Sequence, residues 1–404
     1  MSRVRQGFRV ELDPTVQQCA RLAQHAGLSR VVENFCLALV KAALDQRNAE
    51  RTYGIGEERL TPVPWSAPAL EKAWRAAHPT AYPWFTQAGL SSRVPKEACR
   101  VRAAGLRNWA DSRKGARRGG RVGFPTWRKR RHGFRFRYDA DRAHPTGPSM
   151  VALPGVGPVR TREDMSWLTG RIGDGRARII GATVRQQAGR WWVSFQLEID
   201  RTDVDTRRAV AADAPTCGID LGLATFAVIA DDTGQVEEIH APRALKAAQR
   251  KLRRANQALA RCQRGSANRA KAVRKIASVH LKVAHQRADF LHQLTTRLAT
   301  SKRAIAVESL NVAGMLRNRR LARAVSDAGF AEFVRQLQYK TTWYGSTVWA
   351  ADRWYPSTKT CSVCRAVNAG LTLSDRSWTC RCGATHNRDH NAARNLLTAM
   401  HAAT

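Results

Sequence analysis

The segment Cys217–Val228, CGIDLGLATFAV, decides the fold that this sequence predicts. It starts an apolar run that contains a single acid, Asp220, and that continues to a turn at Asp231–Gly234. We expect one strand before this turn and a second strand after it, because turn residues separate two runs of strand-forming side chains. An acid near the end of a strand is commonly a turn or cap residue. Asp220 alone therefore says little about function.

Two further acids occupy comparable positions later in the chain. Glu308 ends an apolar stretch within Arg303–Val312, RAIAVESLNV, and Asp389 precedes the final helix. Together with Asp220 they match an RNase H-like fold of the RuvC type, in which two parallel strands and a C-terminal helix bring three acids to one end of a sheet. Three such carboxylates repel one another, whereas two Mg²⁺ ions would neutralise them and favour a phosphate. We predict that these acids bind two Mg²⁺ ions and catalyse phosphodiester hydrolysis.

Four of the nine cysteines form two closely spaced pairs. Two residues separate Cys361 from Cys364, and one residue separates Cys380 from Cys382. Four thiolates make a closed tetrahedral site for structural zinc, and an odd number of cysteines argues against a disulfide framework. The second pair is one residue shorter than in a zinc ribbon, so His386 remains an alternative ligand. A redox role is less favoured, because no helix follows either pair to lower a thiol pKa.

The composition indicates a polyanionic partner. Lys and Arg number 68 against 32 for Asp and Glu, which gives a formal net charge of +36. Such a charge destabilises a compact fold by self-repulsion unless a partner neutralises it. A membrane is the alternative partner, but the sequence has no apolar run of about 18 residues to span a bilayer, and its N-terminus lacks the apolar core of a signal peptide. We expect a nucleic-acid-binding protein of the prokaryotic cytoplasm, associated with the nucleoid.

Two almost purely basic segments are the predicted nucleic-acid contacts. In Ser112–Tyr138, a basic cluster precedes a strand in which Phe134, Phe136 and Tyr138 alternate with arginines. Arg243–Lys275 contains twelve Lys and Arg residues and no acid. In a strand this alternation makes one face aromatic and the other cationic, and we expect most of the aromatic rings to lie in the core. The predicted phosphate contacts are Arg128, Lys129, Arg130, Arg131, Arg135, Arg137, Arg250, Lys251, Arg253 and Arg254.

The remaining segments predict the elements around these motifs. Residues 8–14 form a strand, and residues 15–120 are helical, with a helical hairpin around Gly27. Turn signals and the strand Arg190–Asp200 predict a small β-barrel or sandwich completed by the N-terminal strand. The long helical region Arg243–Ser301 breaks near Gly265, and Gly345–Pro356 predicts a further strand.

The motifs resemble those of the TnpB proteins of insertion sequences, RNA-guided nucleases related to miniature type V CRISPR effectors. The resemblance lies in GIDLGLATFAV, VESLNV, YPSTKTCSVC, WTCRCG and NRDHNAARNL, and more weakly in the N-terminal FRVELDPTVQQCARLAQHAGLSRVVENF and VGFPTWRKRRHGFRFRY. It implies a multidomain α+β protein with these parts: a wedge β-barrel of residues 1–14 and 121–211, a helical recognition lobe of residues 15–120, a RuvC-like nuclease domain of residues 212–355 and 386–404, and a zinc-knuckle insertion of residues 356–385.

The same resemblance implies an RNA-guided DNA endonuclease, with a guide RNA and double- and single-stranded target DNA as partners, most simply as a monomer. A guide–target duplex of about 20 base pairs carries about 40 phosphates, similar to the charge excess of 36. A miniature type V CRISPR effector, a guide-directed DNA binder or repressor without cleavage, and a cut-and-paste transposase are the alternatives. All three acids are present, which favours a nuclease over a repressor. The zinc knuckle between the second and third acids favours a TnpB-like layout over the transposase.

Overall fold

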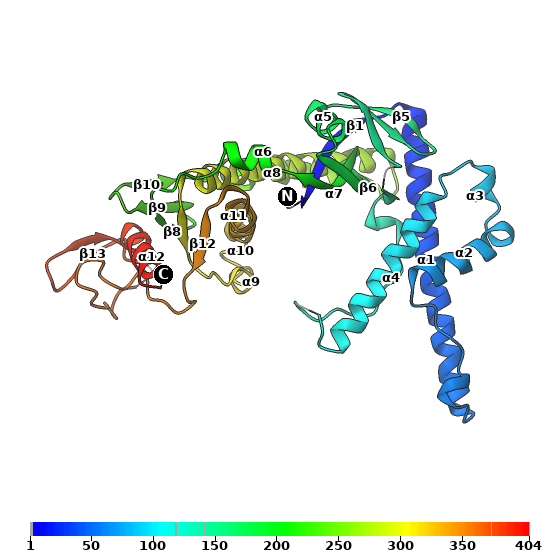
Figure 1. Ribbon diagram of the computed structural model, residues 1–404, viewed down its shortest axis with the longest axis horizontal. Coiled ribbons are helices and arrows are strands. Elements are labelled where there is room, and N and C mark those ends of the chain that lie inside the picture. Colours follow the sequence, from blue (N-terminus) through cyan, green and yellow to red (C-terminus); the bar gives the residue numbers. More distant parts are fainter. Residues whose placement is uncertain (1–2, 118, 141, 373, 404) are drawn as a thin grey trace. The chain divides into compact units, whose positions relative to one another are not determined.

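The computed structural model describes residues 3–117, 119–140, 142–372 and 374–403. The chain divides into two compact units, Met1–Arg201 and Thr202–Thr404. Each unit contains one large sheet with helices attached to it (Figure 1). Across the described ranges, no helix combines the length and the apolar character that crossing a membrane requires.

The N-terminal unit is built on a seven-stranded antiparallel sheet in the order β2-β6-β7-β1-β5-β4-β3. The predicted strand Arg190–Asp200 is confirmed as β7. This order leaves β2 and β3 as edge strands, so the closed barrel stays a prediction. The strand bounds are β1 Arg3–Asp13, β2 Arg135–Asp139, β3 His144–Gly147, β4 Met150–Leu153, β5 Gly157–Thr161, β6 Ala177–Gln187 and β7 Arg190–Asp200.

Aromatic side chains of β2 lie in the core of this unit, as predicted. Phe136 and Tyr138 are 1% and 0% exposed, and Phe134 packs against the same core while partly buried. The Tyr138 hydroxyl donates a hydrogen bond of 2.8 Å to the carbonyl oxygen of Pro154. The alternating pattern of this strand therefore reflects an apolar face packed on the core and a face of arginines outside it.

Helices fill the connection between β1 and β2, also as predicted. They are α1 Val16–Thr52, α2 Ala67–Ala81, α3 Trp84–Gln87 and α4 Arg93–Arg113, with a 3₁₀ turn at Glu57–Arg59; another turn, Arg130–His132, precedes β2, and α5 Ser166–Gly173 follows β5. The predicted hairpin around Gly27 is wrong, because α1 continues through this residue without a break. One glycine costs a helix only about 1 kcal/mol, which the packing of a long buried face outweighs.

The C-terminal unit contains a five-stranded sheet in the order β10-β9-β8-β11-β12. Strands β8, β11 and β12 are parallel, while β9 and β10 run antiparallel to their neighbours. The predicted pairing of the first strand with a later parallel strand is therefore present. The strand bounds are β8 Cys217–Leu221, β9 Ala227–Asp231, β10 Val236–Ile239, β11 Ala304–Val307 and β12 Thr347–Ala350.

Two predicted strands have different bounds in the structure. The run from Cys217 to the turn at Asp231 forms two antiparallel strands, β8 and β9, rather than one. The chain reverses at Gly222, whose N–H donates to the carbonyl oxygen of Phe226 at 3.1 Å, and a Cβ at Gly222 would lie only 2.7 Å from the carbonyl oxygen of Thr225. Both strands are buried, and the connection between them, GLATF, has Thr225 as its one polar side chain, so the sequence marks this turn only weakly. The strand predicted for Gly345–Pro356 ends at Ala350 and continues as a loop.

Helices cover both faces of this sheet. Ile305 and Val307 of β11 pack with α8 and α11 side chains such as Leu291 and Phe333, whereas Ala306 packs with Leu396 of α12. Because alternate residues of a strand point to opposite faces, α12 lies on the face opposite α8 and α11. The remaining bounds are α6 Thr202–Arg207, α7 Ala244–Ala260, α8 Ala267–Ser301, α9 Val312–Met315, α10 Ala322–Ala328, α11 Phe330–Tyr344, β13 Ser377–Thr379, β14 Thr385–Asn387 and α12 Arg388–Ala403.

The predicted break between α7 and α8 is confirmed. Gly265 adopts a φ of +86°, and the Ser266 hydroxyl accepts a hydrogen bond from the N–H of Arg269, which caps α8.

On the opposite face of the sheet, the backbone of α12 lies directly on Gly218 of β8. A Cβ at Gly218 would collide with the carbonyl oxygen of Ala393. The absence of a side chain at this position therefore sets how closely α12 approaches the sheet.

Candidate active site

The three predicted acids come from three elements that meet at one edge of the sheet. Asp220 is on β8, Glu308 directly follows β11, and Asp389 is in the first turn of α12. The last register pair of β8 and β11 joins Ile219 to Val307, so the next residues along the two strands are Asp220 and Glu308. The packing of α12 on β8 then adds Asp389.

The electrostatics of the site follow from burial and mutual repulsion. Burial raises the pKa of Asp220 well above its usual value, and the negative charges of Glu308 and Asp389 raise it further, while Arg388 partly offsets them. Burial also raises the pKa of Glu308, although the hydroxyl of Ser357 donates a hydrogen bond of 2.8 Å to its Oε1 and favours the ionised form. The hydrogen bond between the two carboxyl groups raises the pKa of Asp220 and lowers that of Glu308. Both interactions make Asp220 the carboxyl group of the pair with the more strongly raised pKa.

Asp389 is held at the N-terminus of α12. The side chain of Asn387 caps the helix, since its Oδ1 accepts hydrogen bonds from the N–H groups of Asp389 at 3.0 Å and His390 at 3.2 Å. The Asp389 carboxylate lies 3.0 Å from Nη2 of Arg388 and 3.7 Å from Nη1 of Arg376. This carboxylate is 22% exposed, so it borders solvent while Asp220 is buried beneath it.

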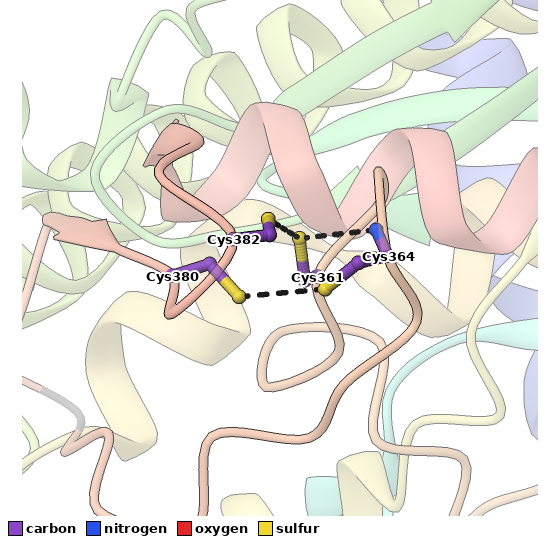
Figure 2. A group of neighbouring side chains, drawn as sticks. All are labelled: Cys361, Cys364, Cys380 and Cys382. Atoms are coloured by element: carbon purple, nitrogen blue, oxygen red, sulfur yellow. Dashed lines mark hydrogen bonds between the residues drawn. The ribbon is translucent and has the colours of Figure 1, made fainter.

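The four predicted cysteines come together between β12 and α12. Cys361 and Cys364 lie on one loop and Cys380 and Cys382 on another, with their sulfur atoms turned toward one another (Figure 2). Among the described residues, this is the group of His, Cys, Asp and Glu side chains whose ligand atoms all lie within 4.8 Å of one another. Two of the sulfur–sulfur distances are 3.6 and 3.8 Å.

These distances suit a tetrahedral metal site. With Zn–S bonds of about 2.3 Å, the edge of a regular tetrahedron is about 3.8 Å. Burial would raise the pKa of Cys361, but the N–H groups of Cys364 and Val363 and the ring of His386 outweigh it and lower the pKa to about 6. A thiolate at neutral pH is the form that binds zinc. The four thiols therefore fit structural zinc without help from another side chain.

His386 takes a supporting position next to this cluster. Its Nε2 lies 3.1 Å from Sγ of Cys361, and its ring packs against Trp378 with centroids 4.8 Å apart. The side chain is 5% exposed and belongs to β14, directly before α12. The group of mutually close sulfur atoms is complete without it, so His386 acts as a neighbour of Cys361 in this geometry.

Two asparagines of α12, which the sequence analysis did not single out, connect the cysteine loops to the helix. Asn391 Nδ2 donates to the carbonyl oxygen of Thr360 at 2.7 Å, and its Oδ1 accepts from the N–H of Ser362 at 2.9 Å. Asn395 Nδ2 donates to the carbonyl oxygens of Ser357 at 2.8 Å and Thr360 at 2.6 Å. Both amides are at most 1% exposed. The spacing of four residues in NAARN, which places both on one helix face, is the signal that could have found them.

Most of the predicted nucleic-acid contacts are on the surface of their units. Of the ten, eight are exposed: Lys129, Arg130, Arg131, Arg135, Arg250, Lys251, Arg253 and Arg254. Within the described part of the chain, none of these eight forms an ion pair. Their side chains are therefore available to external phosphates.

The other two predicted contacts have partners inside the protein. Arg128 is 8% exposed, and its guanidinium lies 2.5 Å from Glu33 and donates to the carbonyl oxygen of Arg135 at 2.6 Å. The structure gives it a buried carboxylate in place of the predicted phosphate, and removal of either charge would leave the other unpaired in the core. Arg137 is half-buried, 3.6 Å from Glu97, and donates to Gln196 at 3.1 Å. Sequence spacing could not distinguish these arginines from their exposed neighbours.

Three family models match parts of the chain. The IS605 OrfB model described as "Probable transposase" matches residues 195–319, which contain the first two acids. The "Cas12f1-like, TNB domain" model matches residues 330–396, which contain the four cysteines and the third acid. A "Helix-turn-helix domain" model matches residues 1–49, where the structure has β1 and the single helix α1.

Similar proteins cover almost the whole chain. A Mycobacterium tuberculosis protein named "Putative RNA-guided DNA endonuclease" is 36% identical over 97% of this chain and 85% of its own length. A Streptomyces pristinaespiralis protein of the same name is 32% identical over 100% of this chain and 91% of its own length. The solved structure entitled "Cryo-EM structure of the Cas12f1-sgRNA-target DNA complex" shares the fold, with a TM-score of 0.51 at 12% identity and 98% coverage of both chains.

The raised pKa of Asp220 leads to a prediction about stability in a chelator. In the unfolded chain Asp220 ionises at its usual pKa, so at neutral pH folding must take up a proton or bury a charge. The stability that the protonated side chain of Asp220 gives to the wild-type fold is therefore lost as the pH rises through the folded-state pKa of Asp220. Asp220→Asn removes this free-energy cost of folding, so the variant should have a higher Tm than the wild type at pH 7–8. Each kcal/mol of cost removed should raise the Tm by about 2–4 °C. At about pH 4, near the unfolded pKa, the difference should vanish.

Thermal unfolding in EDTA between pH 4 and pH 8 measures this effect, and Mg²⁺ should then raise the Tm of the wild type but not of the variant. The matched control is Asp289→Asn, because Asp289 is an exposed acid of α8 in the same unit. A Tm of Asp220→Asn at or below that of the wild type at every pH would contradict the assignment.

The cysteine cluster predicts about one zinc ion per chain. Cys361→Ser should lose most of the zinc and lower the Tm by several degrees, because binding of a structural metal contributes to folding free energy. Cys262→Ser is the control, since Cys262 lies outside the cluster at the end of α7. Elemental analysis and thermal unfolding measure both effects. Metal-free wild-type protein of unchanged stability would show that the thiols hold no zinc.

Proposed function

Because the chain belongs to the TnpB family of insertion-sequence proteins, and its Mycobacterium tuberculosis and Streptomyces pristinaespiralis relatives carry the name "Putative RNA-guided DNA endonuclease", we propose that it is a Mg²⁺-dependent RNA-guided DNA endonuclease. The observation that carries this proposal is the cluster of Asp220, Glu308 and Asp389. Asp220 is buried and Glu308 is partly buried, and the pKa values of both are raised without a lysine or arginine that fully neutralises them. Such destabilised charge is typical of a functional site. We assign the three acids the catalytic role.

The donor set fits hard divalent cations. Carboxylate oxygens are the ligands that Mg²⁺ prefers. Two such ions about 3.5–4 Å apart are the arrangement that phosphodiester hydrolysis commonly uses. When bound, two Mg²⁺ ions would supply an activated water and stabilise the leaving oxygen of an in-line displacement.

The protein's own groups prepare this site for a phosphate. Both Asp220 and Glu308 must be ionised to act as ligands, and a bound cation would favour this ionised form against their burial. The Ser357 hydroxyl, 2.8 Å from Oε1 of Glu308, fixes the orientation of that carboxylate. Arg388 sits beside Asp389 and acts on the charge of Asp220, so it provides a positive group next to the acids. This positive group favours the anionic oxygens of a backbone phosphate.

The zinc cluster and the asparagines of α12 would serve the same site indirectly. The loop that begins after β12 bonds to Glu308 through Ser357, to α12 through Asn391 and Asn395, and then supplies Cys361 and Cys364. A metal that closes this loop onto β13 and β14 would hold the start of α12, where Asp389 lies. We assign zinc a structural role that positions a catalytic acid.

The exposed cations provide the means to hold nucleic acid. Four cations of α7 have no acidic partner among the described residues: Arg250, Lys251, Arg253 and Arg254. The first N–H groups of this helix donate hydrogen bonds to the carboxylate of Asp327. Contacts of this kind read the phosphate backbone and not the base sequence. Sequence recognition would then be delegated to base pairing between the guide and the target strand. We assign this face of α7 to the guide RNA or its duplex with DNA.

The catalytic assignment predicts a separation of cleavage from binding. Asp220→Ala, Glu308→Ala and Asp389→Ala should each lower the cleavage rate by more than about 100-fold, the scale of losing one group that stabilises a transition state. Chelation of divalent metal should have the same effect on the wild type. Binding of the guided complex to its target should stay within about threefold, because most of its affinity comes from phosphate contacts and base pairing.

The experiment uses the RNA that co-purifies with the protein and a DNA that matches its variable end. Cleavage and band-shift assays are run on the same preparations, with Asp289→Ala as the control for loss of an acid outside the site. Full cutting by any one of the three variants would remove that residue from the catalytic set. Loss of target binding in all three would indicate a structural defect.

The role assigned to α7 predicts a change in salt dependence. Replacing Arg253 and Arg254 together with alanine should lower the slope of log affinity for RNA against log salt by about 1–2, because each lost phosphate contact removes about one unit. The control replaces Arg297 and Arg335, which carry the same charge but already pair with Glu237 and Glu332. An unchanged slope in the α7 variant, measured by filter binding from low to moderate salt, would show that the guide is held elsewhere.

A further inference from the structure

Trp354 is the most exposed tryptophan among the described residues. It is 80% exposed, whereas the next, Trp127, is 42% exposed. A large aromatic ring in water contributes nothing to the core, and exposed aromatic rings on basic proteins are suited to stacking on bases. The position of this ring therefore needs an explanation other than packing within its own unit.

The loop that carries Trp354 starts and ends beside a catalytic acid. At its start, the N–H of Ala351 donates to the carbonyl oxygen of Val307 at 2.9 Å, and the Ser309 hydroxyl donates to that of Ala351 at 2.6 Å. At its end, Ser357 donates to Glu308. Two residues separate Trp354 from either end, so its Cα lies within about 11 Å of the Cα atoms of Ala351 and Ser357. The loop is therefore tied at both ends to the segment that carries Glu308, where a strand bound at the acids would come near it.

Local hydrogen bonds hold the loop and direct Trp354 outward. Asp352 Oδ1 accepts from the N–H of Trp354 at 2.8 Å, and the N–H of Tyr355 donates to the carbonyl oxygen of Asp352 at 3.1 Å. Tyr355 is anchored on α12, where its ring packs on the cluster of Leu396 and its hydroxyl donates to the carbonyl oxygen of Asn395 at 3.1 Å. Since Tyr355 turns toward the protein, its neighbour in the chain is presented to solvent.

One cation lies directly beside the ring. The guanidinium of Arg353 lies 5.2 Å from the ring centroid of Trp354, and this arginine is exposed. The loop contains one acid, Asp352, which is engaged by the backbone N–H of Trp354. An aromatic face next to a guanidinium is the pair that binds a base and its phosphate in proteins that hold single strands.

We propose that Trp354 stacks on a base of the DNA strand that enters the active site and that Arg353 contacts an adjacent phosphate. This inference rests on the proposed nuclease function and refines its substrate. The bases of a duplex are stacked on one another, so their faces are closed to a side chain, whereas an unpaired strand offers them. Trp354 thereby selects single-stranded DNA at the catalytic acids and fixes its register.

The test places 2-aminopurine, whose fluorescence falls when it stacks, at successive positions around the cleavage site of a matching target. The full-length protein with its co-purified RNA is studied in Ca²⁺ to prevent cleavage. The wild type should quench the 2-aminopurine fluorescence at one of these positions. Trp354→Phe should quench it partly, and Trp354→Ala should not quench it. In Mg²⁺, Trp354→Ala should cleave about 5- to 150-fold more slowly at limiting substrate, the range expected for the loss of one stacked base. Trp354→Phe should stay within about tenfold.

Val367→Ala is the matched control, because Val367 is a 58% exposed apolar residue between the two cysteine pairs and outside the loop. Equal quenching by wild type and Trp354→Ala overturns the proposal, as does a lower Tm of Trp354→Ala with unchanged fluorescence. If the wild type cleaves no guided target, the nuclease function fails by itself. Stacking is then tested with a 2-aminopurine-labelled single strand bound to the RNA-free protein and to the same variants. Loss of quenching in Trp354→Ala supports the proposal, and equal quenching by the wild type and Trp354→Ala overturns it.

Discussion

The contact between the backbone of α12 and Gly218 of β8 is the constraint on which the C-terminal unit depends. A Cβ at this glycine would collide with the carbonyl oxygen of Ala393, so any other residue would push the helix away from the sheet. The helix carries Asp389 at its start and covers β8, which carries Asp220. A shift of about 1 Å between these elements is enough to disturb a catalytic geometry. The small residues of GIDLG and NAARN thus position the candidate active site, although none of them takes part in chemistry.

Opposing electrostatic effects are balanced around this contact. The sheet edge brings carboxylates together, buries Asp220 and partly buries Glu308, which raises their pKa values and destabilises the ionised, metal-free fold. The zinc-type cluster and the buried amides of Asn391 and Asn395 stabilise the same region from the other side of α12. Acids that repel one another are thus held in place by hydrogen bonds in the core, next to four thiols whose spacing suits a metal ion. This arrangement explains why a cysteine pair directly precedes an isolated acid in the chain.

The positive charge of the protein is divided between two uses. Arg128 and Arg137 pair with Glu33 and Glu97 and stabilise the N-terminal unit from within. The cations of α7 extend from a helix that has no acid and remain available to phosphates. Both kinds of arginine occur in equally basic stretches of sequence. Net charge therefore predicts the class of partner, whereas the position of each acid in the fold decides which cations remain available to bind that partner.

Local patterns were sufficient to predict the elements and the candidate chemistry. The apolar runs predicted strands that end close to Asp220 and Glu308, the cysteine spacing predicted a four-thiol cluster, and alternation in β2 predicted its buried aromatic rings. These features depend on residues close in sequence, through the periods of strands and helices and the reach of short loops. The structure differs from the prediction at three places: the hairpin around Gly27, the single strand through Gly222 and the role of Arg128. A helix with one glycine, a tight turn between two buried strands and a buried ion pair all depend on partners far along the chain, and only the tertiary fold supplies those partners.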